Sequence, residues 1–233
     1  MSRRVVISVV AINGWYPRGA ARLIEAFHQT GNGHEIQAWV NVLPPGCPSG
    51  VIVDGYDYTP YCAKPFALAH AAKNADQVIL LDAAFYPVQS IQPLIDYIAR
   101  VGYYFCENGN PVGEWISDAA LMAFRMSRDE AMGIKEVSSY CVGVDVRKCQ
   151  QLIDAWPLTA SSFPGPHTNR GHKGRNVGWC SDDSRCKGHR HDQSALSILA
   201  HRLGMNVLSQ RPRFTSYLGD STSETCLVNH GGF

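Results

Sequence analysis

The sequence predicts a single α/β domain, in which helices cover both faces of a mostly parallel sheet. Short apolar runs alternate with amphipathic stretches along the 233-residue chain, which is typical of repeated β-α-β units. The run from Val78 to Leu81 is continuously apolar, as expected for a parallel strand that is buried on both faces. A chain of this length can bury one substantial core. We therefore expect one domain over residues 1–233.

The elements follow from the spacing of the apolar residues. Strands are predicted where apolar and β-branched residues run together or alternate, at residues 4–12, 36–42, 77–82, 103–106 and 138–146. Helices are predicted where apolar residues recur every three or four positions, at residues 17–30, 59–74, 91–100, 149–156 and 194–203. Residues 113–118 are expected to open a further apolar helix that runs through Phe124. The Pro- and Gly-rich residues 43–57 are expected to form a connector.

The composition excludes several classes of protein. With 45% hydrophobic and 18% charged residues and a formal net charge of +1, the chain is neither disordered nor a globally basic nucleic-acid binder. The first apolar run has no small-residue cleavage site, and no run approaches the roughly 20 apolar residues that span a bilayer. We expect a soluble, cytoplasmic protein without a membrane partner, in which the eight cysteines are free thiols.

Asp82 is the first candidate site residue, because it ends the buried strand over residues 77–82. Ligands of open α/β sheets bind outside the carboxyl ends of the strands. A carboxylate in such a position is costly unless it is paired, hydrogen-bonded or bound to a metal. Asp82 is therefore expected to meet the ligand. The alternative is a strand-end Asp that caps the following turn.

Two further segments point to phosphate binding. The loop of residues 13–16 follows the first strand, where a parallel α/β domain first contacts a nucleotide, so Asn13 and Tyr16 are candidate contacts. This loop contains neither a GxGxxG motif nor a P-loop lysine, which disfavours a dinucleotide fold and a kinase-type NTPase. Lys64, near a helix start, is unfavourable for the helix dipole but suited to a phosphate. A solvated surface lysine is the alternative.

Residues 165–191 are predicted to form a long basic loop, with six Lys or Arg and four His against two Asp. The loop leads into Asp192 and Gln193 at the start of the helix over residues 194–203, where Asp192 is placed at the N-cap. Four residues with soft or borderline metal ligands lie within twelve positions and offer a structural Zn²⁺ site as an alternative: Cys180, Cys186, His189 and His191.

Four segments in this order resemble the nucleotide-sugar glycosyltransferases of the GT-A class, in particular the branch of glycogenin-like and lipopolysaccharide galactosyltransferase-like enzymes. They are residues 61–68 with Lys64, LLDAA at residues 80–84, SSYCVGVDVR at residues 138–147, and HDQ at residues 191–193. The resemblance implies a GT-A-like (Rossmann-like) domain. It also implies transfer of a sugar from a nucleoside diphosphate sugar, with a UDP-sugar favoured.

The resemblance also implies a divalent cation. In this family the apolar strand ends in Asp-x-Asp, which holds Mn²⁺ or Mg²⁺ against the diphosphate, whereas this chain has Asp82-Ala83-Ala84. The first Asp is kept and the last is lost, and His230 near the C-terminus is the second expected ligand. Lys64 and Arg190 are candidates to replace the metal electrostatically. A metal held by Asp82 and His230 is the favoured interpretation.

By the same resemblance, the sugar is expected to lie near Asp192 and Gln193. In a retaining enzyme they would hold sugar hydroxyls and stabilise the oxocarbenium-like face, and in an inverting enzyme Asp192 would be the general base. Asp118 is a third catalytic candidate, although it or Ser117 could instead be only a helix N-cap. Glu107 and Asn108 are expected to end a strand at the same sheet edge. The remaining donor-side candidates are Ala84, Ser139, Gly143, Arg190 and His191.

The acceptor is expected on the side of the basic loop. Cationic and aromatic side chains suit a phosphate backbone and an extruded base, so DNA, with a hydroxymethylated pyrimidine of phage DNA as the target, is one expected acceptor. The candidate acceptor contacts are Trp115, Arg170, Lys173, Arg175 and Trp179. The loop could instead be a lid over the diphosphate. A carbohydrate or a lipid-linked acceptor is also compatible with the sequence, as are a nucleotidyltransferase and a catalytically decayed DNA-binding protein, the last suggested by Ala84.

Overall fold

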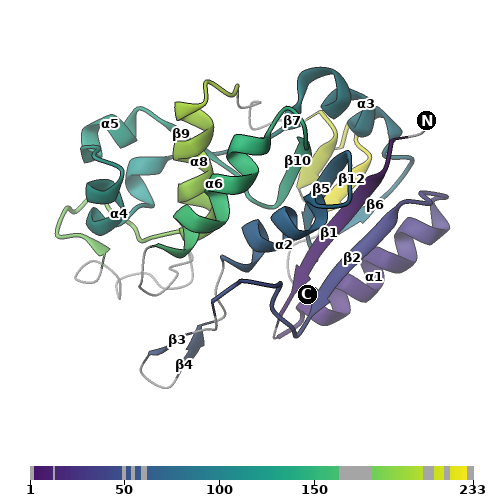
Figure 1. The fold of residues 1–233 in the computed structure, drawn as a ribbon, viewed down its shortest axis with the longest axis horizontal. Helices are drawn as coiled ribbons and strands as arrows, with labels where there is room; N and C mark the ends of the chain where they lie inside the picture. The colour runs from purple at the N-terminus through teal and green to yellow at the C-terminus, as the bar shows by residue number, and fades with distance from the viewer. Residues whose placement is uncertain are drawn as a thin grey trace.

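A central sheet of five strands organises the structure (Figure 1). The computed structural model describes residues 3–12, 14–48, 51–53, 56–58, 62–162, 180–206, 213–217 and 221–229, and only the backbone of 51–53 and 56–58. The strand order is β2 (Glu35–Val40), β1 (Val5–Ala11), β5 (Gln77–Asp82), β10 (Cys141–Asp145) and β7 (Tyr103–Tyr104). β1 is parallel to β2 and β5, whereas β10 runs antiparallel to β5 and β7. The predicted α/β class with a mostly parallel sheet is confirmed.

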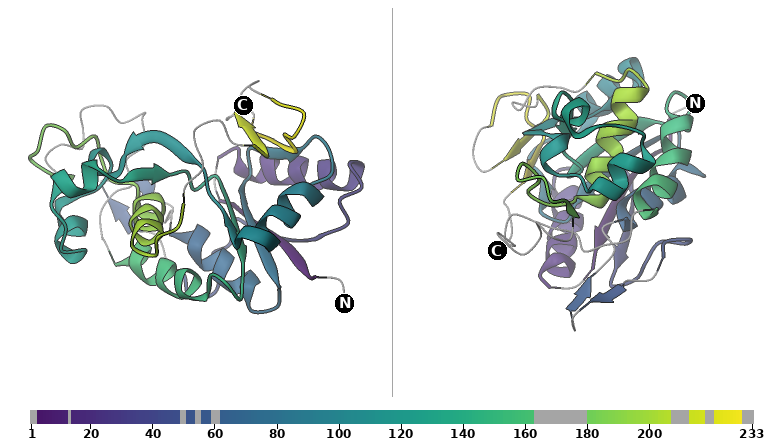
Figure 2. Two further views of the ribbon diagram at one scale, coloured as in Figure 1. Left: turned by 90° about the horizontal axis from the view of Figure 1, so that it is seen from above. Right: turned by 90° about the vertical axis from the view of Figure 1, so that its left-hand side faces the viewer.

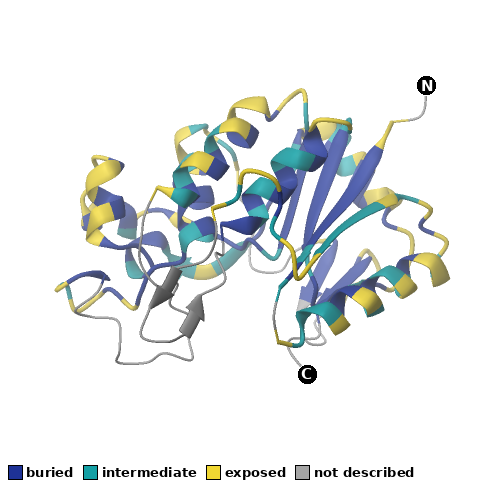
Figure 3. Ribbon diagram, turned by 60° about the horizontal axis from the view of Figure 1, so that its bottom comes forward, coloured by how far each residue is buried: buried dark blue, intermediate teal, exposed yellow. Residues whose placement is uncertain are grey.

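Helices lie on both faces of this sheet (Figure 2). One face is covered by α1 (Tyr16–Gln29) and α3 (Gln92–Val101), and the other by α2 (Ala63–Ala72), α6 (Gln150–Ser161) and α8 (His191–Arg202). Successive strand residues point to opposite faces, so Ile79 packs with the first layer, and Val78 and Leu80 with the second. The central strands β1, β5 and β10 are therefore buried from both sides, whereas the edge strand β2 is only partly buried (Figure 3).

Shorter elements complete the described fold. They are β3 (Val51–Val53), β4 (Tyr56–Tyr58), β6 (Phe85–Pro87), β8 (Glu107–Pro111), η1 (Val112–Glu114), α4 (Asp118–Ala123), α5 (Arg128–Met132), β9 (Lys135–Val137), β11 (Thr215–Tyr217) and β12 (Leu227–Asn229). β11, β12 and β6 form a three-stranded sheet, and β3–β4 and β8–β9 form antiparallel pairs. No helix in the described ranges is both long enough and apolar enough to cross a membrane.

Three expectations about these elements were wrong. The connector over residues 43–57 contains β3 and leads into β4. The strand expected at residues 103–106 ends after two residues, and Glu107 and Asn108 leave the central sheet to join β8, which pairs with β9. α8 begins at His191 with Arg190 as its N-cap residue, so Asp192 is not the cap. The Asp192 carboxylate is instead turned inward to an ion pair with Lys64.

Candidate active site

Three charged side chains meet at the carboxyl end of β5. Lys64 Nζ lies 2.6 Å from Asp82 Oδ1 and 3.8 Å from Asp192 Oδ2. Lys64 is the second residue of α2, Asp82 the last residue of β5, and Asp192 the second residue of α8. The fold thus brings one ammonium and two carboxylates from distant parts of the chain to the sheet edge where α/β proteins bind ligands.

The burial of this triad is graded. The apolar residues of β5 are buried up to Leu81, so Asp82 is the first side chain of the strand to reach the surface, and it is 28% exposed. The Lys64 side chain is 15% exposed and the Asp192 side chain 1%. A residue of α6 holds the backbone of Asp192 in place, because Trp156 Nε1 donates to the Asp192 backbone oxygen at 2.8 Å. A ligand would therefore meet Asp82 and Lys64 first, with Asp192 beneath them.

The pKa values of Lys64 and Asp82 are both shifted in this cluster. Burial alone lowers the pKa of Lys64, but the carboxylates of Asp82 and Asp192 outweigh it, so its pKa is raised and the ammonium stays charged. Burial raises the pKa of Asp82, and the nearby Asp192 adds to this effect while Lys64 opposes it. Tyr16 lies close enough to contribute to the raised pKa of Lys64, which places this predicted donor contact beside the triad.

Ser139 and Gln193 extend the triad, as the sequence predicts for both. Lys64 Nζ donates to the Ser139 backbone oxygen at 3.3 Å and to Ser139 Oγ at 3.4 Å. The backbone nitrogen and hydroxyl of Ser139 each donate to Gln193 Oε1 at 3.4 Å. Ser139 lies in the short segment between β9 and β10, so this segment connects the lysine to the amide of α8.

The structure does not support the predicted roles of Arg190 and Trp115. Arg190 is 8% exposed, pairs with Glu136 Oε2 at 2.7 Å, and lies over the Trp115 ring with its guanidinium carbon 3.7 Å from the ring centroid. Trp115 itself is only 5% exposed. Arg190 is therefore not a second cation available to replace a metal, and Trp115 is not available for an acceptor. A buried guanidinium is stabilised by a counterion and by the face of an aromatic ring. Glu136 supplies the counterion and Trp115 supplies the ring.

The stability of the protein is expected to depend on pH through Glu136. Burial raises the pKa of this carboxyl to about 7, although Arg190 and Asn108 favour its charged form. The folded state then binds this proton more tightly than the unfolded chain. The contribution of Glu136 to the free energy of unfolding is therefore fully present below about pH 4.5 and is lost as the pH rises through about 7. This contribution is on the order of 3 kcal/mol.

Glu136→Gln is expected to remove this dependence while keeping an acceptor for Arg190. Denaturant unfolding across this pH range would show it as a flatter dependence of the free energy of unfolding on pH. Glu25→Gln, at an exposed position of α1, is the matched control and should keep the wild-type slope. An equal slope in wild type and Glu136→Gln would contradict the assignment.

Asp118 lies in a different cluster from the triad. Its Oδ1 accepts from Arg128 Nη2 at 2.6 Å, and the buried Arg128 also donates to the backbone oxygens of Gly113 and Ile116. Ser117 is the N-cap of α4, since its Oγ accepts from Ala120 N at 3.2 Å. The geometry therefore supports a structural role for Asp118 at the start of α4, and its predicted catalytic role receives no support.

Three other predicted donor contacts face the protein. A Cβ on Gly143 would lie 2.5 Å from Ile98 Cδ1, so the close neighbour of this glycine is α3 and not a ligand. Ala84 is 6% exposed, and its carbonyl accepts from Arg22 Nη2 at 2.9 Å. The ring of His191 packs on His189 with the centroids 4.5 Å apart. The remaining predicted contacts lie outside the described residues: Asn13, Arg170, Lys173, Arg175, Trp179 and His230.

The described residues do not by themselves form a complete metal site. Asp82 Oδ1 pairs with the Lys64 ammonium at 2.6 Å, and the second predicted ligand, His230, lies outside the described residues. No group of three or more His, Cys, Asp or Glu side chains in the described ranges could hold a metal ion. The alternative Zn²⁺ site is not formed either, because Cys186 Sγ donates to the carbonyls of Ile116 and Gly188, and His189 Nδ1 accepts from Ser117 N.

Comparison with known proteins places this architecture. No family model matches the sequence, and no curated protein matches it. Among solved structures, the chain is similar to the crystal structure of a glycosyltransferase involved in the glycosylation of the major capsid of PBCV-1. The TM-score is 0.54 and the sequence identity 10%, with 97% of this chain and 92% of that chain covered. The chain shares its fold with this glycosyltransferase. At this identity the likeness establishes the fold alone, and the predicted GT-A-like class is confirmed.

Two residues with structural roles near the site are not among the candidates predicted from the sequence. Glu136 balances the buried Arg190, and Arg128 holds the segment from Gly113 to Asp118. The motif Ser127-x-x-Glu130 is a capping box, and it was the available signal for α5, at whose start Arg128 lies. Glu136 carried no comparable signal, because a glutamate beside Lys135 also fits an exposed strand.

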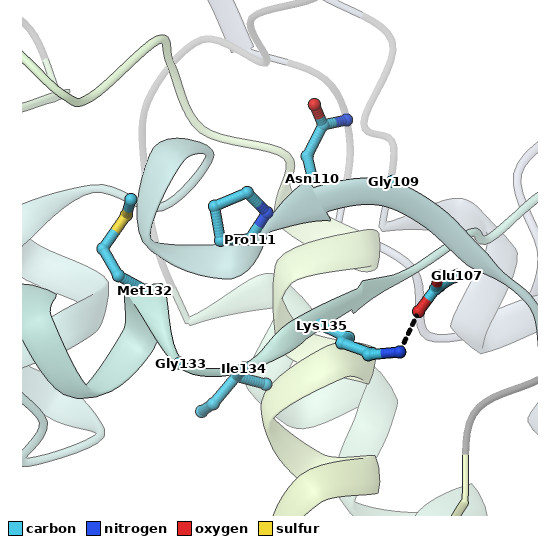
Figure 4. Close-up of a pocket in the computed structure, with 8 residues that line it drawn as sticks. All are labelled: Glu107, Gly109, Asn110, Pro111, Met132, Gly133, Ile134 and Lys135. Carbon is cyan, nitrogen blue, oxygen red and sulfur yellow. Dashed lines mark ion pairs between the residues drawn. The ribbon is translucent and has the colours of Figure 1, made fainter. Parts of the chain in front are cut away.

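A pocket of about 230 Å³ lies elsewhere on the glycosyltransferase fold (Figure 4). It is lined by residues of β8, α5 and β9 and the turn between α5 and β9: Glu107, Gly109, Asn110, Pro111, Met132, Gly133, Ile134 and Lys135. Lys135 Nζ closes one side by pairing with Glu107 Oε2 at 2.7 Å. None of these residues belongs to the triad, so this pocket is separate from the candidate active site.

Proposed function

We propose that this protein transfers a sugar from a nucleoside diphosphate sugar, preferably a UDP-sugar, to an acceptor hydroxyl. The observation that supports this most is the approach of Asp82 and Asp192 to one ammonium, with 2.6 and 3.8 Å between Lys64 Nζ and their nearest oxygens. This cluster lies at the ligand-binding edge of the sheet. The glycosyltransferase fold is the second support.

Lys64 is assigned to the diphosphate. Sugar transfer breaks the bond between the anomeric carbon and the diphosphate, so negative charge grows on the departing group. Lys64 is the cation of the cluster, and its raised pKa keeps it charged. Because two carboxylates surround one ammonium, Lys64 must exchange part of its contact with Asp82 for phosphate oxygens when the donor binds. A divalent cation held by Asp82 and His230 is the alternative source of positive charge for the diphosphate.

Asp192 is assigned to the sugar. Its Oδ2 is buried and accepts no hydrogen bond within the described part of the chain. A buried carboxylate oxygen without a donor costs free energy, and a sugar or acceptor hydroxyl would supply that donor. Gln193 lies beside it on α8 and is tied to Ser139. Asp192 would either hold sugar hydroxyls near the developing positive charge or act as the general base for the acceptor.

The acceptor is proposed from the chemistry of the basic loop. Where the loop is described, its cations are already paired: Arg185 with Asp183 and Asp129, Lys187 with Glu114, and Arg190 with Glu136. Contact with a phosphate backbone would therefore depend on Arg170, Lys173 and Arg175. DNA containing a hydroxymethylated pyrimidine is the proposed acceptor. A carbohydrate acceptor is the alternative, and transfer to an oligosaccharide but not to such DNA would favour it.

A donor screen tests the proposed function. Thermal unfolding would be followed with UDP, GDP and the corresponding UDP-sugars, each with and without Mn²⁺, because a ligand that binds the native state raises its stability. A rise of several degrees with UDP in the absence of metal is expected if Lys64 supplies the charge. A rise only with Mn²⁺ would overturn that assignment while leaving the donor in place.

Hydrolysis of the donor and transfer to the acceptor complete the test. Radiolabelled UDP-sugars would be incubated with duplexes containing either hydroxymethylcytosine or cytosine. Slow donor hydrolysis by the wild type, and its loss in Asp82→Ala and Asp192→Ala, are expected. Asp154→Asn, at an exposed position of α6, is the control. DNA binding with neither nucleotide binding nor donor hydrolysis would instead favour a decayed transferase.

A further inference from the structure

Two cysteine thiols lie next to each other beside the triad. Cys47 Sγ and Cys62 Sγ are 4.0 Å apart, and both cysteines are free. Cys62 is buried and is the N-cap residue of α2, two positions before Lys64, whereas Cys47 is only partly buried. The Asp192 carboxylate is close enough to Cys62 to affect its thiol. One member of the pair is therefore next to the candidate active site, and its partner is nearer to solvent.

The backbone around Cys47 holds it against α2. A turn brings Cys47 N to the carbonyl of Pro44 at 3.1 Å. Within this turn Gly46 has a φ of +80°, and a Cβ built there would lie 3.6 Å from the Phe66 ring of α2. The turn and the helix are therefore in direct contact. The approach of the two sulfurs results from this packing, since the cysteines are 15 residues apart in the sequence.

The contact between the two thiols shifts their pKa values in opposite directions. The hydrogen bond between Cys47 and Cys62, in which either sulfur could be the donor, has the largest effect on the pKa of Cys62 and lowers it, whereas burial and Asp192 raise it. The same hydrogen bond, together with burial, raises the pKa of Cys47. Cys62 is thus the thiol that loses its proton more readily, and the thiolate is the form that reacts with oxidants. The other described thiols with a resolved shift have raised pKa values, with burial as the main cause.

We propose that Cys47 and Cys62 are a reversible oxidation site, in which a hydroperoxide converts the pair into a disulfide. The Cys62 thiolate attacks one oxygen of hydrogen peroxide, the O–O bond breaks, and Cys62 becomes a sulfenic acid with release of water once a proton is taken up. Cys47 then attacks the Cys62 sulfur, forming the S–S bond and releasing a second water. Two thiols lose two electrons and two protons, and one peroxide is reduced to two waters. An external dithiol reverses the change.

Formation of this disulfide is expected to change contacts in the candidate active site. The sulfurs must move from 4.0 Å to about 2 Å apart, which requires rotation of the two side chains, a shift of the turn or of the first residues of α2, or both. Lys64 lies in the first turn of α2 and is held by contacts to Asp82 and Ser139. A shift of the Cys62 backbone would change these contacts. Oxidation is therefore expected to weaken diphosphate binding, and this second step depends on the proposed function.

Peptide mapping tests the disulfide without any assumption about activity. The full-length protein would be treated with one equivalent of hydrogen peroxide, alkylated, digested and analysed by mass spectrometry. A peptide linking Cys47 to Cys62, lighter by about 2 Da, is expected to form at least about tenfold faster than modification of the other cysteines. It should disappear with dithiothreitol. Cys180→Ser is the control and should retain it.

Three results would count against the proposal. The proposed disulfide is contradicted if Cys62 is still alkylated after peroxide treatment while other thiols are oxidised. It is also contradicted if Cys62 forms a disulfide with a different cysteine. The Cys47→Ser and Cys62→Ser variants give separate tests, because Cys47→Ser removes only the partner farther from Lys64. The effect on the site is overturned if the linked peptide forms but the UDP-induced thermal shift is unchanged. If no UDP shift exists in reduced protein, the donor proposal fails and the disulfide result still stands.

Discussion

Lys64→Met is expected to abolish binding of nucleoside diphosphates and to lower the free energy of unfolding by about 3 kcal/mol at neutral pH. The ammonium is the counterion of Asp192, whose side chain is 1% exposed. Without it, two carboxylates are left facing each other at the end of β5. Removal of one partner of a buried ion pair leaves an uncompensated charge, which costs more than the pair itself contributes.

The loss of stability should depend on pH. Burial raises the pKa of Asp82 and Lys64 opposes this effect, so without Lys64 the Asp82 carboxyl would be easier to protonate, and a proton would remove its uncompensated charge. The variant should therefore lose less stability at about pH 5 than at about pH 8. Chemical denaturation at the two pH values, together with UDP thermal shifts, would measure both effects.

Two variants make the Lys64 result interpretable. Lys73→Met changes an exposed lysine immediately after the same helix and should match the wild type in both measurements. Lys64→Met combined with Asp192→Asn should recover part of the lost stability, because the second change neutralises the buried acid, but it should not recover UDP binding. Full UDP binding by Lys64→Met would show that another cation meets the diphosphate.

Asp192→Asn is expected to reduce sugar transfer by about 100-fold or more, with little change in the affinity for UDP. The substitution keeps the size of the side chain but removes the negative charge that would stabilise the sugar or accept a proton. Its backbone contact with Trp156 and its place on α8 are unaffected, so the fold should be retained. Initial rates at saturating and limiting donor would separate the change in kcat from that in KM.

Asp82→Asn gives the contrasting result for the same cluster. Asp82 is the more exposed acid, pairs directly with Lys64 at 2.6 Å, and is assigned to the donor side. Its replacement should therefore mainly change donor affinity, whereas Asp192→Asn should mainly change turnover. Asp154→Asn is again the matched control. Equal effects of the two substitutions on affinity and turnover would contradict the separate roles of the two acids.

Local sequence patterns were sufficient for most of the central fold. The expected strand over residues 77–82 coincides with β5, and those over 4–12 and 36–42 differ from β1 and β2 by one or two residues at each end. The runs of β1 and β5 are recognisable because burial on both faces requires nearly uninterrupted apolar residues. The short β8–β9 pair was not predicted, since two-stranded pairing depends on a partner distant in sequence. Asp82 and Lys64 were selected from residue type and position within elements, whereas Asp192 and Gln193 were selected from the resemblance at residues 191–193.

The sequence by itself determined the class of fold, the buried strand that ends in Asp82, and the residue types available for diphosphate chemistry, because these depend on periodicity and composition. The tertiary structure decided which charges neutralise one another. It gave Arg190 to Glu136, Asp118 to Arg128, and Lys64 to Asp82 and Asp192. The energy of an ion pair depends on distance and burial across elements remote in sequence, and neither quantity is written in local patterns.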